Sequence, residues 1–108
     1  MANSFLTQLA LVKRALQEGL EEISPDISID TRNSSSVAEA FYQVPAEELV
    51  IHFRNRRRKF YFYPMNGANA AAFALAGSKG RWLRQRTVRT VGRDPRSGRF
   101  GQNPRRKG

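Results

Sequence analysis

The sequence predicts an α+β domain: an N-terminal amphipathic helix, a small antiparallel sheet with a β-hairpin, and one or two following helices. Apolar residues recur at helical spacing near the N-terminus, and short apolar segments bounded by turn residues follow them. The last residues, 92–108, are rich in glycine, proline and arginine, and we expect this tail to be disordered or ordered by a partner. A chain of 108 residues is most simply one domain with a modest core.

The first expected element is a helix within residues 1–23, because its apolar side chains are three or four residues apart. Asn3 or Ser4 can cap its start, Gly19 weakens it without ending it, and Ser24-Pro25-Asp26 stops it. These apolar side chains pack on the rest of the domain or, alternatively, contact a partner or a second copy of the chain. The residues of that contact are Phe5, Leu9, Val12, Leu16 and Leu20. The mixed charge of the polar face argues against membrane binding.

Residues 24–36 have the composition of a polar linker, with one short extended piece at 27–29. Strands are expected at 37–42, 48–53 and 59–63. A polar turn between the last two predicts a hairpin whose tip carries several arginines.

The alternation of the second strand places Leu49, Ile51 and Phe53 on one face and Val50 and His52 on the other. In the third strand, Tyr61 and Tyr63 are expected to share the core face. Phe60 and Phe62 then point to the opposite face, where the N-terminal helix could cover them.

Residues 68–76 are strong helix formers, and Phe73 with Ala72 or Ala76 is expected to face the sheet. Residues 77–80 offer a stop with a glycine suited to the left-handed conformation. Residues 81–91 are compatible with a helix or a strand.

Several of these segments together resemble the KTSC domain family. The resemblance rests on Ser35-Ser36, the apolar segment to Tyr42, Leu49-x-Ile51-x-Phe53, Tyr61-Phe62-Tyr63 and Ala76-x-Ser78-Lys79-Gly80-x-x-Leu83. It covers residues 35–91 and departs from the family's pattern at 44–47, at 64–67 and at Trp82. The family also occurs at the C-terminus of some lysyl-tRNA synthetases. The resemblance implies a small α+β domain without known catalysis, for which RNA or other nucleic-acid binding is suspected.

The charge of the chain is divided unevenly. Residues 1–53 hold three basic and eight acidic side chains, a balance of −5, whereas residues 54–108 hold sixteen basic side chains and Asp94, a balance of +15. This concentration predicts a polyanion partner, either nucleic acid or an acidic protein surface. Arginine suits phosphate because its planar fork donates two parallel hydrogen bonds.

We therefore expect a small nucleic-acid-binding protein that is not an enzyme, and we do not predict whether its ligand is DNA or RNA. The predicted phosphate contacts are Arg54, Arg56, Arg57, Arg58, Lys59, Lys79, Arg81, Arg84, Arg86, Arg89, Arg93, Arg96, Arg99, Arg105, Arg106 and Lys107. Phe60, Phe62 and Trp82 could stack on bases, with core packing as the alternative.

No catalytic residue, metal or cofactor is predicted, since there is no cysteine and no acid lies beside His52 in an evident motif. Two other functions fit the same charge. The chain could be a structural component of a phage particle or similar assembly, docking through the N-terminal helix and the basic tail. It could also be a basic inhibitor of an acidic host protein. We expect a cytoplasmic location, or the virion if the chain is structural.

Overall fold

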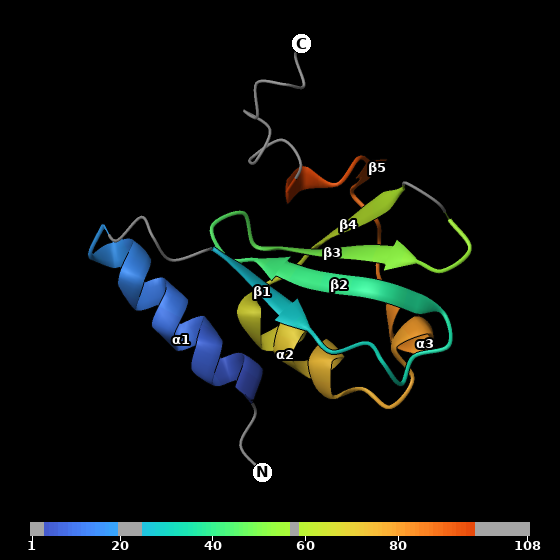
Figure 1. Cartoon of the computed structure of the whole chain (residues 1–108), viewed down its shortest axis with the longest axis horizontal. Helices are drawn as coiled ribbons and strands as arrows, with labels where there is room; N and C mark the ends of the chain where they lie inside the picture. The colour runs from blue at the N-terminus through green and yellow to red at the C-terminus, as the bar shows by residue number, and fades with distance from the viewer. Residues whose placement is uncertain (1–3, 20–24, 57–58, 97–108) are drawn as a thin grey trace.

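The structure, a computed structural model, describes residues 4–19, 25–56 and 59–96. Five antiparallel strands form one sheet in the order β1-β2-β3-β4-β5 (Figure 1). The strands are β1 Asp26–Ile29, β2 Val37–Gln43, β3 Glu48–Phe53, β4 Phe60–Pro64 and β5 Thr90–Gly92, and the helices are α1 Ser4–Gln17, α2 Gly67–Leu75 and α3 Lys79–Leu83. The α+β class and the β3–β4 hairpin are therefore confirmed, and the extended piece at 27–29 is a strand of the sheet.

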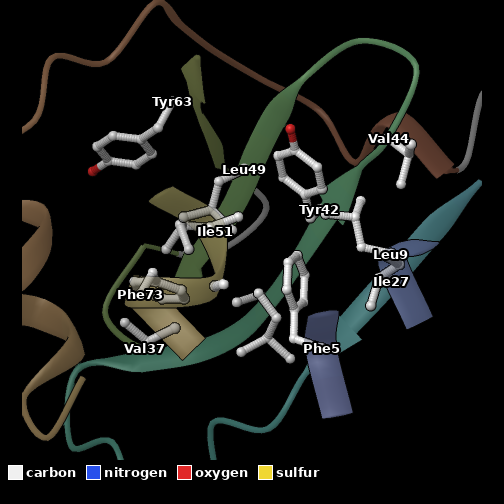
Figure 2. Packing of buried hydrophobic residues seen from close by; sticks show 14 of the residues in the cluster. Phe5, Leu9, Ile27, Val37, Tyr42, Val44, Leu49, Ile51, Tyr63 and Phe73 are labelled. Atoms are coloured by element: carbon white, nitrogen blue, oxygen red, sulfur yellow. The ribbon is translucent and has the colours of Figure 1, made fainter. Parts of the chain in front are cut away.

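The helices pack on one face of the sheet, here called the inner face. This face carries Leu49, Ile51 and Tyr63, and Figure 2 shows them packed with Phe73 of α2 and Phe5 of α1. The opposite or outer face carries a separate small cluster of Phe41, Val50, Phe60 and Phe62. The predicted alternation of β3 and β4 is thus confirmed, because the two clusters divide these residues by face.

An irregularity in β2 explains why this segment alternates poorly in the sequence. The register between β2 and β3 shifts between Val37 and Glu39, so Ala38 is an extra residue in the ladder. Val37 and Ala40 then belong to the same inner cluster although they are three residues apart. A regular strand would have placed them on opposite faces.

Helix α1 differs from the prediction in its end and in its location. It ends at Gln17, and Gly19 has a φ of 75°, a left-handed conformation that glycine adopts without steric cost. Ala15 is buried in place of Leu16, which is exposed. The expectation that α1 covers Phe60 and Phe62 is wrong, because Phe5, Leu9 and Val12 pack on the inner face.

Helix α2 begins at a conventional cap, since the side chain of Asn66 accepts a hydrogen bond from the backbone N–H of Asn69 at 2.9 Å. A Cβ atom on Gly67 would lie 2.3 Å from Leu9, so this glycine lets α1 approach closely. Phe73 is fully buried as predicted, whereas Ala72 is exposed.

Helix α2 ends differently from the expectation. Among the described glycines only Gly19 has a positive φ, so Gly77 and Gly80 are not left-handed stops. The Nζ atom of Lys79 instead donates to the carbonyl oxygens of Ala74 and Ala76, both at 3.2 Å. A lysine charge at this position also complements the helix dipole.

The segment 81–91 contains both of the predicted alternatives, since α3 occupies its start and β5 begins at Thr90. The segment expected to be a tail, which begins at residue 92, is described as far as Arg96, and Arg96 contacts the sheet. Arg96 pairs with Glu39 at 2.6 Å and with Asp94 at 2.9 Å, and its guanidinium lies 4.2 Å from the centre of the Phe41 ring. The segment after β5 therefore covers part of the outer face.

Candidate nucleic-acid interface

Three of the predicted phosphate contacts are engaged within the fold. Arg89 pairs with the buried Glu48, Arg96 pairs with Glu39 and Asp94, and Lys79 caps α2. The pairing with Glu48 raises the pKa of Arg89. Arg89 lies in an extended segment before β5, so it does not share a helix side with Arg81 and Arg84 as expected. These cations stabilise the protein and have less freedom to meet a ligand.

Two further arginines are held in place but remain exposed. Arg54 donates from its side chain to the carbonyl oxygen of Ser34, at 3.1 Å from Nη2. Arg86 lies over the ring of Trp82 at 4.0 Å from its centre. Trp82 also meets Phe73 edge to face at 5.5 Å and is half-buried, so this tryptophan is packed against the core, with a guanidinium over its ring.

The remaining described cations are free. Arg56, Lys59, Arg81, Arg84 and Arg93 are exposed and form no ion pair with a described residue. The predicted contacts at Arg57, Arg58, Arg99, Arg105, Arg106 and Lys107 lie outside the described residues.

Four of these free cations, Arg56, Lys59, Arg81 and Arg84, come from the turn after β3 and from helix α3 with the residue that follows it. Figure 1 shows the turn after β3 and helix α3 at the same end, away from α1. Arg56 and Arg84 come from these two segments and line one open pocket of about 460 Å³. Its other lining residues are Ser36, Phe53, Asn55, Tyr61, Tyr63, Gly80 and Leu83.

The pocket is rich in hydrogen-bond donors and contains no carboxylate among its lining residues. The hydroxyl groups of Tyr61 and Tyr63 have no hydrogen-bond partner among the described residues. Burial, together with the neighbouring Tyr61, raises the pKa of Tyr63, so its hydroxyl stays protonated and can donate at neutral pH. Figure 2 shows Tyr63 at the edge of the inner cluster, with its hydroxyl directed away from Leu49 and Ile51.

Two small residues shape the pocket wall. A Cβ atom on Gly80 would lie 2.3 Å from the Oγ atom of Ser36. Glycine therefore lets α3 lie close to Ser36, directly before β2, without displacing the serine hydroxyl, and both residues line the pocket.

The sequence did not identify Ser36, Asn55, Phe53, Tyr61 or Tyr63 as site residues. They come together only because β2, the β3–β4 hairpin and α3 meet at one end of the sheet. The one available signal was the pattern Tyr61-Phe62-Tyr63, which indicated a core face.

Most of the residues that were expected to stack on bases or to contact a partner helix are buried within the domain. Phe60 and Phe62 are 7% and 8% exposed, so neither offers an open ring face; the packing of the outer face explains this. Phe5, Leu9 and Val12 are buried within the domain, which leaves them unavailable to a partner helix, whereas Leu16 is exposed. Leu20 lies outside the described residues.

The described residues contain no group of three or more metal-ligating side chains. No helix among them has the length and apolar character needed to cross a membrane. Comparison with protein-family models, curated proteins and solved structures finds no match. The likeness to the KTSC family stays a prediction.

Proposed function

We propose that this protein binds nucleic acid through the end of the molecule formed by the turn after β3 and helix α3. The observation that supports this function best is the set of free cations there: Arg56, Lys59, Arg81 and Arg84 are exposed, with no ion pair to a described residue. They belong to two segments that the fold brings together. Unpaired arginines on one surface attract phosphates, and their contacts supply affinity without reading sequence.

The test is fluorescence anisotropy with labelled single strands of DNA and RNA and with a duplex, each titrated over a range of salt. Neutralisation of about six to ten phosphates gives a slope of log K against log salt of roughly −5 to −9 on duplex DNA. The double variant Lys59→Ala/Arg81→Ala should weaken binding to every sequence and reduce that slope by about two.

Lys13→Ala is the matched control, because Lys13 is an exposed lysine on α1, at a distance from α3. It should leave the slope on the same probes unchanged. Binding that persists at high salt, or an equal loss in Lys13→Ala, would contradict the proposal. An equal affinity for polyglutamate would favour an acidic protein as the partner instead.

A second candidate, a structural component of a phage particle or similar assembly, is favoured by α1. Leu6 and Leu11 of this helix are 47% and 62% exposed, and Leu16 is 39% exposed. A docking contact would use these leucines, not the buried stripe. Light scattering after size-exclusion chromatography tests this function: an oligomer that Leu11→Asp dissociates would support it, and a monomer at high concentration would count against self-assembly.

A further inference from the structure

We propose that the pocket between β2, the β3–β4 hairpin and α3 binds a single nucleotide unit. Its phosphate lies between the guanidinium groups of Arg56 and Arg84, and its base lies against Phe53 and Tyr61. This inference rests on the proposed function and extends it, because it assigns the basic end of the molecule a defined subsite.

The charge of the pocket indicates an anion. Two guanidinium groups line the same open cleft, and no acidic side chain lies among the lining residues to balance them. Arg89 and Arg96, by contrast, meet carboxylates on the outer face of the sheet. A planar guanidinium donates two parallel hydrogen bonds to a phosphate, and two such groups can hold one phosphate from both sides.

The neutral donors favour a phosphate over a simple counterion. The hydroxyl groups of Ser36, Tyr61 and Tyr63 all belong to the pocket lining and have no partner among the described residues. Since burial raises the pKa of Tyr63, this hydroxyl offers a proton to an oxyanion at neutral pH. Phosphate oxygens can accept several such hydrogen bonds at once.

The size and the aromatic wall favour a nucleotide over a phosphate alone. The pocket of about 460 Å³ falls within the range of roughly 300–1,000 Å³ that is usual for small-molecule sites. Phe53 and Tyr61 are half-buried and contact each other edge to face at 5.1 Å, so part of each ring remains open to the pocket. Asn55 adds an amide that can donate to and accept from a base edge.

A nucleotide in this pocket predicts a preference for single strands. A base held inside a duplex is stacked and paired, so it would have to leave the helix before it could meet Phe53 and Tyr61. The same chemistry could also come from a free nucleotide, and the experiment below separates these two sources.

The direct test is calorimetric titration of the full chain with adenosine 5′-monophosphate, inorganic phosphate and adenosine. We expect the monophosphate to bind more tightly than either part alone. Arg84→Ala should weaken its binding about tenfold to a hundredfold, through loss of charge-assisted hydrogen bonds. Lys13→Ala is the control: this exposed cation lies on α1 and outside the pocket lining, so its loss should change binding by less than about threefold.

A second variant tests the pocket without removing a charge. Gly80→Ala brings a methyl group to 2.3 Å from the Oγ atom of Ser36, so the serine hydroxyl must turn away from its place. The variant should therefore weaken binding of the monophosphate while leaving the number of cations unchanged. Thermal unfolding of each variant shows that it is folded. Equal effects of Arg84→Ala and Lys13→Ala on binding of the monophosphate would overturn the inference.

Anisotropy with a labelled single-stranded oligonucleotide separates the inference from the proposed function. If the oligonucleotide binds and the monophosphate does not, the pocket assignment is wrong and nucleic-acid binding stands. If the monophosphate binds and the oligonucleotide does not, the pocket is a site for free nucleotides and the proposed function is wrong. If neither binds, both are overturned. If both bind and both are weakened by Arg84→Ala more than by Lys13→Ala, the nucleotide of the strand occupies the pocket.

Discussion

The two faces of the sheet are covered by different chemistry. On the inner face, apolar side chains of α1, α2 and α3 pack on the strands in one continuous cluster. On the outer face only Phe41, Val50, Phe60 and Phe62 form a cluster, and arginine side chains lie over its rings. Arg96 lies over Phe41 and Arg89 over Phe62, at 4.2 and 5.9 Å from the ring centres.

This difference shows that part of the positive charge contributes to the packing of the sheet. Arg89 and Arg96 cover aromatic rings while they pair with acidic side chains of β2 and β3. Long cationic side chains can shield apolar surface while their charged ends stay near water. Arg56 and Arg84 have no such partner among the described residues, and they belong to the proposed interface.

The largest expected effect is on the inner face. Phe73→Ala should lower the free energy of unfolding by about 3–5 kcal/mol, because it leaves a cavity at a fully buried position. Phe62→Ala should cost less, since this residue belongs to the smaller outer cluster and the charged Arg89 side chain lies over its ring. Urea unfolding measures both, with Leu75→Ala at a position 71% exposed as the control. Equal losses for Phe73→Ala and Phe62→Ala would show that the two faces contribute equally to the free energy of unfolding.

A smaller effect is expected where an arginine covers the outer face. Arg96→Ala should lower the free energy of unfolding by about 1–2 kcal/mol through loss of the contact with Phe41 and of two ion pairs. Arg96→Lys keeps the charge without the planar contact and should lie in between. If Arg93→Ala, at an exposed arginine nearby, costs as much in urea unfolding, Arg96 does not cover this face.

The smallest expected effects are pH dependences that differ between the faces. Burial alone would raise the pKa of Asp94, but hydrogen bonds from Arg96 lower it below 3.8. A lowered folded pKa contributes stability above about pH 4 that is lost as the pH falls through the folded value. Burial, and then the charge of Glu47, raises the pKa of Tyr42 from 10.0 to about 12. Its contribution is present below about pH 10 and is lost as the pH rises towards 12.

Carboxyl NMR and the absorbance of tyrosinate measure these titrations in the folded protein. Asp94→Asn should reduce the loss of stability at acid pH that comes from the outer face. Tyr42→Phe should remove the tyrosine titration that has a pKa of about 12. The pKa of Asp30 is lowered to about 2 by its hydrogen bonds with Arg32, so Asp94→Asn is best compared in an Asp30→Asn background. If Asp94→Asn leaves the loss of stability at acid pH unchanged in that background, Asp94 does not contribute to it.

The sequence predicted the strands well where alternation is regular. Leu49, Val50 and Ile51 alternate in β3 as expected, because each strand face has its own apolar cluster. The strand β2 was also predicted, but the division of its residues between the two faces was not, because the extra residue at Ala38 shifts the phase of the pattern. The prediction of which sheet face α1 covers was also wrong. An amphipathic stripe does not indicate on which of two apolar faces the helix will pack.

The sequence by itself determined the fold class and the concentration of positive charge, since both depend on local composition and on the spacing of apolar residues. The tertiary structure decided which cations are free, because Glu39 and Glu48 lie far along the chain from Arg96 and Arg89 and meet them only through the sheet. It also decided which residues line the pocket. Strand pairing and the close approach of Gly80 bring Ser36, Tyr61 and Arg84 to one end of the sheet. Contacts between distant segments depend on packing that no local pattern records.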